Sequence, residues 1–248
     1  SFVTIVGDAS VPVAKLLTRP TTILENGAHV MNRSIQLPED LYGESRKNSA
    51  GLEFGYAEER LALTGGISKT VFPAVSATPL VPGLDELGAG QNVLSPVDGA
   101  TVAGSVVNGS RDTVEQAMAA ATTGFESWSR MPVEERAACL DKMGDLLEEN
   151  RDRLMALLCV EAGKTLTDGI AELREAVDFC RYYAAEARGL FGGGRLMPGP
   201  TGEENRYRFR GRGVFACISP WNFPLAIFLG QVSSALVAGN AVIAKPAE

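Results

Sequence analysis

The sequence predicts an α/β protein, and three features carry that prediction. Two short apolar runs of buried-strand type, residues 214–219 and 241–245, flank a helical segment at residues 224–238 that a proline opens. A strand, a helix and a second strand in this order form a βαβ unit with parallel strands. Amphipathic helical patterns precede this unit. Because the sheet has only two strands where such folds have several, we expect an incomplete α/β domain.

Residues 1–94 have the weakest periodicity and are expected to form a connecting segment on the surface. Prolines divide this segment into short apolar pieces. One helix is expected at residues 56–67, and residues 37–43 have the composition of an ordered turn.

The compact part of the chain is expected to begin at residues 95–99, which form the turn of a predicted hairpin. Asp112 and Glu115 have the spacing of a helix capping box, and apolar residues recur at helical spacing up to Phe125. Three further helices follow, one opening at Pro132, one over residues 154–159 and one from about Asp168. Residues 206–210 alternate charged and aromatic side chains, which indicates a strand with one solvated face.

The composition argues against several classes of protein. The 248 residues include 23 Lys and Arg against 30 Asp and Glu, so a nucleic-acid partner is not expected. No apolar run reaches the roughly 20 residues that a membrane helix needs, and the N-terminus lacks the order of a signal peptide. We therefore expect a cytoplasmic protein without a membrane span.

Metal sites and disulfides are not expected either. The four cysteines form no C-x-x-C pair, and His29 is the only histidine. A catalytic triad or a histidine metal site would depend on this single residue, which we interpret as an ordinary loop histidine.

Polar and aromatic side chains follow both predicted sheet strands. Residues 219–224, with the sequence Ser-Pro-Trp-Asn-Phe-Pro, follow the first strand, and residues 244–248 end the second. Ligands of open α/β sheets bind at the carboxyl ends of strands, so these groups together could hold a nucleotide ribose. Taken one at a time, they have structural interpretations: Trp221 and Phe223 as core, Asn222 as a turn former, Lys245 as a solvated strand end.

Two motifs at matched spacing resemble the aldehyde dehydrogenase superfamily. They are Pro-Trp-Asn-Phe-Pro at residues 220–224 and Gly-Asn-Ala-Val-Ile-Ala-Lys-Pro-Ala-Glu at residues 239–248. Upstream matches to the same superfamily are residues 95–99, Trp128, Arg136, 161–165 and 178–184. The resemblance implies an α/β aldehyde dehydrogenase-like fold, truncated. Residues 91–248 would hold its N-terminal helices, the first βαβ of an NAD-binding Rossmann-like domain and an oligomerisation β-hairpin with a strand at about 203–211.

The resemblance also implies a role for each residue at the strand ends. Asn222 would donate its side-chain amide to the oxygen of a thiohemiacetal, and Phe223 would form one wall of the aldehyde pocket. The implied cofactor is NAD, with no metal, and its contacts would be Ser219, Pro220, Trp221, Lys245 and Glu248. Lys245 and Glu248 would bind ribose hydroxyls, and the charge of Glu248 would disfavour the 2′-phosphate of NADP.

The implied reaction begins with attack of a cysteine thiolate on an aldehyde and ends with hydrolysis by a glutamate-activated water. The superfamily places this cysteine and this glutamate downstream of the lysine strand, so neither is in the chain. Cys217 lies inside a predicted buried strand and is interpreted as structural. We therefore expect the chain by itself to oxidise no aldehyde.

Within the superfamily, residues 37–51 and 168–187 resemble the bifunctional proline utilization A proteins. Residues 1–3 resemble the sequence after the proline dehydrogenase barrel of those proteins, so residues 1–90 would be a linker that follows an absent barrel. FAD would belong only to that barrel. The implied function is NAD-dependent oxidation of L-glutamate γ-semialdehyde, formed from 1-pyrroline-5-carboxylate, to L-glutamate, with a small-molecule aldehyde as substrate and a homo-oligomer as assembly.

Two other interpretations remain open from the sequence. Another NAD-dependent aldehyde dehydrogenase, such as a succinate-semialdehyde type, would share every motif from residue 90 onward. A non-catalytic scaffold or oligomerisation fragment would also fit the truncated fold. Whether the natural sequence continues to a nucleophilic cysteine discriminates the enzymes from the scaffold.

Overall fold

A computed structural model describes residues 10–17, 19, 35–73, 75–84 and 88–247. The chain divides into two units, residues 1–37 and 38–248. In the first unit the described structure contains the short helix α2 (Val13–Leu16). His29 and Glu248 lie outside the described residues. The candidate site lies in the second unit.

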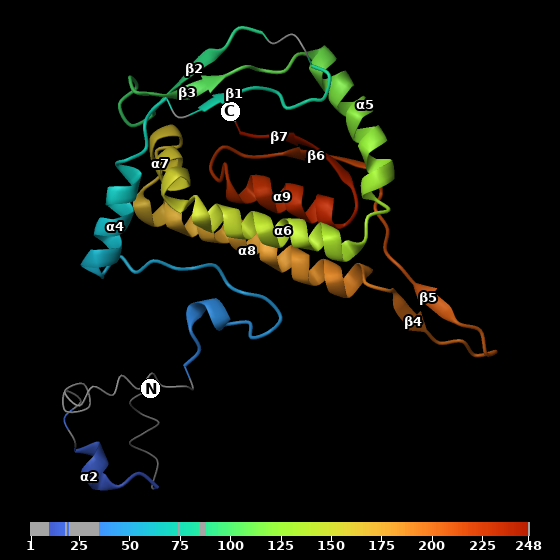
Figure 1. Cartoon of the computed structure of the whole chain (residues 1–248), viewed down its shortest axis with the longest axis horizontal. Coiled ribbons are helices and arrows are strands. Elements are labelled where there is room, and N and C mark those ends of the chain that lie inside the picture. The colour runs from blue at the N-terminus through green and yellow to red at the C-terminus, as the bar shows by residue number, and fades with distance from the viewer. Residues whose placement is uncertain (1–9, 18, 20–34, 74, 85–87, 248) are drawn as a thin grey trace. The chain divides into compact units, whose positions relative to one another are not determined.

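Four long helices form the body of the second unit, as the apolar patterns predict. They are α5 (Arg111–Trp128), α6 (Val133–Glu149), α7 (Arg151–Glu161) and α8 (Leu166–Phe191). α6 and α8 run side by side (Figure 1). The apolar stripe of α8 faces the core and has helical spacing, with Ile170, Leu173, Val177, Cys180 and Ala184 all at most 7% exposed.

The βαβ unit is present and has the expected parallel strands. β6 (Val214–Ile218) pairs in parallel with β7 (Ala241–Lys245), and α9 (Ala226–Val237) connects them. α9 lies between this sheet on one side and α6 and α8 on the other (Figure 1). Its residues Ala226, Leu229 and Val237 belong to the same core cluster as the α8 stripe.

The predicted hairpin around residues 95–99 is also confirmed. β2 (Gln91–Leu94) pairs antiparallel with β3 (Val102–Val106), and Asp98 accepts hydrogen bonds from the N–H groups of Ala100 and Thr101 at 2.9 Å. A third strand, β1 (Val75–Ala77), pairs in parallel with β3 and was not expected from the sequence. Its three residues are all exposed, so no alternation marks them as a strand.

The predicted strand at residues 206–210 is shorter than expected. β4 (Arg195–Met197) and β5 (Asn205–Tyr207) form an antiparallel hairpin that projects beyond the end of α8 (Figure 1). Residues 208–210 do not belong to the strand. The centroid of the Phe209 ring lies 4.9 Å from that of Tyr207 and 5.9 Å from that of Phe191. The alternating aromatics therefore pack at the base of the hairpin instead of extending it.

Part of the segment expected to lie on the surface is buried against the helices. The predicted turn at residues 37–43 contains a 3-10 helix (Pro38–Asp40), and the predicted helix is α4 (Ala57–Ile67). Between them, Ser49 is fully buried and donates from its N–H and its hydroxyl to the two carboxylate oxygens of Asp178, both at 2.8 Å. Leu63 of α4 is also fully buried. The proposed linker role of residues 1–90 stays a prediction.

The expected cap of α5 is corrected. Ser110 caps this helix in place of Asp112: its hydroxyl accepts from the Thr113 N–H at 3.2 Å, and the Thr113 hydroxyl accepts from the Ser110 N–H at 3.1 Å. The capping box therefore starts two residues earlier than predicted. The apolar face of α5 is only partly covered, since Val114 and Met118 are 56% and 48% exposed.

The corrected cap gives a stability prediction. Ser110→Ala removes the acceptor of an N-terminal amide and should lower the free energy of unfolding by about 1 kcal/mol. Glu115→Ala removes only an exposed contact with Arg111 and should cost much less. Denaturant unfolding of both variants measures the difference, and a larger loss for Glu115→Ala would support the cap at Asp112.

Candidate functional site

The carboxyl ends of β6 and β7 meet at one edge of the sheet, as the sequence predicts. Ile218 is the register partner of Lys245, and the Ser219 N–H donates to the Lys245 carbonyl at 3.1 Å. This bond extends the ladder by one step and places residues 219 and 245 side by side. Ser219, Asn222 and Lys245 therefore lie along the same edge, while the predicted contact Glu248 is outside the described residues.

The turn between β6 and α9 presents Asn222 to solvent. Residues 221–225 form the turn, and Trp221 beside Asn222 is 79% exposed. Within the described residues the Asn222 side chain is exposed and makes no hydrogen bond. An amide at the open edge of a sheet, with its N–H groups unused by the protein, can donate to the oxygen of a bound molecule.

Ser219 is the buried member of the same edge. It is 6% exposed, and its hydroxyl has no hydrogen-bond partner in the described part of the chain. Buried hydroxyl groups are normally paired, so this oxygen is available to a ligand that reaches the strand end. Pro220 is half-buried between Ser219 and the exposed Trp221, and Lys245 is exposed.

Phe223 and the start of α9 are held by two charged side chains, Lys164 and Glu172, to which the sequence analysis assigned no role. The Lys164 ammonium lies 4.2 Å from the centroid of the Phe223 ring and 2.8 Å from Glu172 Oε2. Glu172 is fully buried, and its Oε1 accepts from the N–H groups of Leu225 at 2.8 Å and Ala226 at 3.3 Å. The signal that could have found Glu172 is a carboxylate inside the apolar stripe of α8.

The far end of α9 is held by side chains from α5 and α6. Trp128 Nε1 donates to the Leu236 carbonyl at 2.8 Å, and Arg136 Nε donates to the Val237 carbonyl at 3.0 Å. Both residues were noted in the sequence only for their resemblance to a family. In the structure both side chains donate to carbonyl groups at the C-terminal end of α9, because the last carbonyl groups of a helix lack partners within it.

Three of the four cysteines do not have the surroundings of a nucleophile, and the fourth, Cys139, is exposed on α6. Cys217 lies in β6 at 5% exposure, and burial raises its pKa. Burial also raises the pKa of Cys159, and that of Cys180 to about 11. A raised pKa leaves little reactive thiolate near neutral pH, which favours the structural interpretation of Cys217. Within the described residues, no group of three His, Cys, Asp or Glu could hold a metal ion, and no helix is long and apolar enough to span a membrane.

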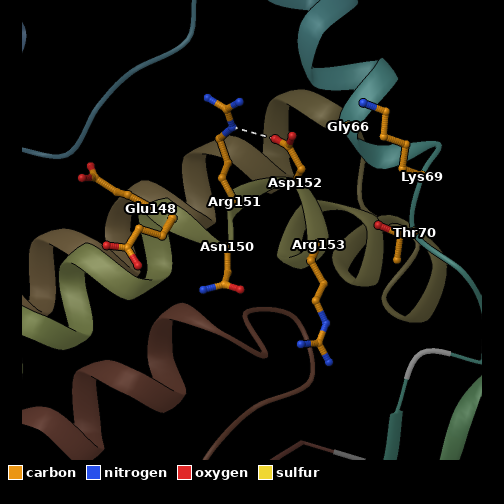
Figure 2. Close-up of a pocket in the computed structure, with 9 residues that line it drawn as sticks. Gly66, Lys69, Thr70, Glu148, Asn150, Arg151, Asp152 and Arg153 are labelled. Atoms are coloured by element: carbon orange, nitrogen blue, oxygen red, sulfur yellow. Dashed lines mark hydrogen bonds and ion pairs between the residues drawn. The ribbon is translucent and has the colours of Figure 1, made fainter.

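A cavity of about 340 Å³ lies away from the strand edge, where α4 ends near the junction of α6 and α7 (Figure 2). Its wall carries both signs of charge, with the Arg151 guanidinium 2.9 Å from Asp152. The other charged residues of the wall are Lys69, Glu148, Glu149 and Arg153. None of the lining residues belongs to β6, β7 or the turn that carries Asn222.

Comparison with known proteins places this architecture in a family. The sequence profile of the aldehyde dehydrogenase family matches residues 85–248. The bifunctional protein PutA of Escherichia coli is 37% identical over 254 residues, which cover all of this chain and 18% of that protein. The chain therefore spans about a fifth of the length of such relatives.

Two solved structures show the same fold. A mutant of proline utilization A (PutA) from Bradyrhizobium japonicum is 45% identical, with a TM-score of 0.74 over all of this chain and 22% of that one. The 1-pyrroline-5-carboxylate dehydrogenase from Thermus with bound NAD is 30% identical, with a TM-score of 0.73 over 81% of this chain and 39% of that one.

Proposed function

The chain belongs to the aldehyde dehydrogenase family, and from this premise we propose that it is part of a bifunctional enzyme of proline catabolism. The enzyme oxidises L-glutamate γ-semialdehyde, formed from 1-pyrroline-5-carboxylate, to L-glutamate with NAD⁺. The observation that carries the proposal is the extent of the match: the PutA relatives align with the whole chain, including residues before the family profile begins at residue 85. Such coverage favours a PutA-type protein over other aldehyde dehydrogenases.

The residues at the strand edge fit a dinucleotide. The unpaired, buried Ser219 hydroxyl and the exposed Lys245 lie at the carboxyl ends of adjacent parallel strands, where open α/β sheets bind nucleotides. Ser219, Pro220 and Trp221 would line the cleft, and Lys245 and Glu248 would hold the adenosine ribose. The negative charge of Glu248 would disfavour a 2′-phosphate, so the proposed cofactor is NAD rather than NADP.

Asn222 supplies the chemistry that this chain contributes to the reaction. When a cysteine thiolate adds to the aldehyde carbon, the carbonyl oxygen becomes negative, and the exposed Asn222 amide donates a hydrogen bond to it. NAD, when bound, would supply the acceptor for the hydride from that carbon. Phe223, half-buried within the turn, would form one wall of the aldehyde pocket. The nucleophile and the general base come from sequence beyond this chain.

The β4–β5 hairpin supports the proposal of a homo-oligomer. All six of its strand residues are exposed, and within the described chain β4 and β5 pair only with each other. An exposed strand edge can pair with another protein chain. We therefore propose that the hairpin contributes to contacts between subunits.

The first functional prediction is that this chain by itself oxidises no aldehyde. It should produce no reduced cofactor when incubated with glutamate γ-semialdehyde and NAD⁺, because the nucleophile and the general base of the proposed reaction are not among its residues. Absorbance of the reduced nicotinamide measures the outcome. Sustained turnover that Cys217→Ser abolishes would show that the nucleophile is in this chain after all.

The second functional prediction separates chemistry from cofactor binding in the enzyme that includes this sequence. Asn222→Ala should slow the chemical step by a factor of about 10² to 10³, because its hydrogen bond strengthens only as the oxygen becomes negative. Lys245→Ala should mainly raise the KM for NAD⁺, because a ribose contact is the same in the ground and transition states. Single-turnover rates and cofactor affinities distinguish the two effects.

The matched control is Asn92→Ala, which replaces an exposed asparagine on β2. It should change neither constant. If Asn222→Ala lowers the melting temperature but keeps its single-turnover rate per folded molecule, the oxyanion role is wrong and Asn222 is only a turn former.

A further inference from the structure

The motif at residues 161–165 has no role in the proposed reaction. Its Lys164, however, places a positive charge beside the turn that carries Asn222. Gly163 has a φ of +65°, and the following Lys164 N–H donates to the Leu158 carbonyl at 3.0 Å. This left-handed step closes α7 and directs Lys164 inward before α8 begins at Leu166. The Lys164 side chain is 14% exposed, so its ammonium is largely withdrawn from water.

Lys164 and Glu172 contact the turn at two separate points. Glu172 accepts from the backbone N–H groups of Leu225 and Ala226, and the Lys164 ammonium lies over the Phe223 ring at 4.2 Å. Lys164 Nζ lies 2.8 Å from Glu172 Oε2, but the geometry is not that of a hydrogen bond. Charge attraction therefore dominates the contact. One contact holds the backbone just after the turn, and the other holds a side chain within it.

The opposite end of the turn is fixed by the sheet. The Ser219 N–H donates to the Lys245 carbonyl, so the chain is anchored three residues before Asn222 and three residues after it. Asn222 itself makes no hydrogen bond within the described residues. Its position therefore depends on these anchors.

We propose that Lys164 and Glu172 are positioning residues, whose buried ion pair holds the turn of residues 221–225 so that the Asn222 amide meets the aldehyde oxygen. The aldehyde part of this inference rests on the proposed function. The pair is interdependent because a fully buried carboxylate needs a neutralising partner, and the N-terminus of α9 supplies only partial positive charge. Removing the Lys164 charge should loosen both points of contact.

The chain contains its own reporters for this test. Its two tryptophans are Trp221, in the turn, and Trp128, which is bonded to the far end of α9. After incorporation of 5-fluorotryptophan, fluorine NMR of the chain gives one resonance for each. Lys164→Met should shift and broaden the Trp221 resonance and leave the Trp128 resonance in place. Lys164→Arg, which keeps the positive charge, should leave the Trp221 resonance close to its position in the unmodified chain.

The matched control is Arg188→Met, which removes an ion-pairing cation on α8 that contacts Glu134 and Asp141 and not the turn. It should move neither resonance. An unchanged Trp221 resonance in Lys164→Met overturns the proposal. Equal loss of both resonances in Lys164→Met overturns it as well, because that result shows a contribution to the whole fold and no specific hold on the turn.

Kinetics in the enzyme that includes this sequence test the link to Asn222. Lys164→Met should lower kcat by a factor of about 10 to 100, as expected for a small misplacement of a catalytic group, and leave the KM for NAD⁺ nearly unchanged. Glu172→Gln, which keeps the acceptor for the two amides, should have a smaller effect of the same kind.

A double-mutant cycle separates this inference from the proposed function. In an Asn222→Ala background, Lys164→Met should lower kcat little further, because the group it positions is gone. Equal losses in both backgrounds would contradict the positioning role. If Asn222→Ala alone leaves the chemical step unchanged, the oxyanion role fails, while the fluorine NMR result still decides whether Lys164 holds the turn.

Discussion

The structure around the candidate site depends on one constraint: α9 is a strongly apolar helix whose N-terminus has no side-chain cap of its own. Its N-cap residue Leu225 makes no side-chain cap, and its first and last turns contain no acidic and no basic residue, respectively. The unpaired amide and carbonyl groups of a buried helix must still be satisfied. Glu172 satisfies the first two amides, and Trp128 and Arg136 satisfy carbonyl groups at the far end. Three helices therefore hold α9 in place.

The position of α9 also fixes the sheet edge at the carboxyl ends of β6 and β7. After α9 the chain turns at Gly239 (φ +88°), and Asn240 accepts from the Gly213 N–H at 3.2 Å while donating to the Ala235 carbonyl at 3.1 Å. The approach there is close: a Cβ on Gly211 would lie 2.1 Å from the Gly239 carbonyl oxygen. The start of β6 is thus joined to the end of α9, and the strand ends that carry Ser219 and Lys245 stay in register.

The sequence predicted the parts of this site that follow from local periodicity. The order of apolar run, helix and apolar run placed Ser219, Asn222 and Lys245 at one edge, because parallel strands end together. It could not predict what holds the turn. Glu172 lies about fifty residues from the amides it binds, and only the packing of α8 on α9 brings them together. The cap of α5 was misplaced for a local reason, since Ser110 and Asp112 both suit an N-cap.

The most direct test of the account is amide hydrogen exchange at Leu225 and Ala226. Amides in the first turn of a helix have no partner within the helix and usually exchange fast. Because Glu172 accepts from both, the account predicts slow exchange at these two positions, comparable to the middle of α9, and fast exchange in Glu172→Ala. Exchange at the rate of an unstructured peptide in the unmodified chain, with the rest of α9 protected, would contradict it.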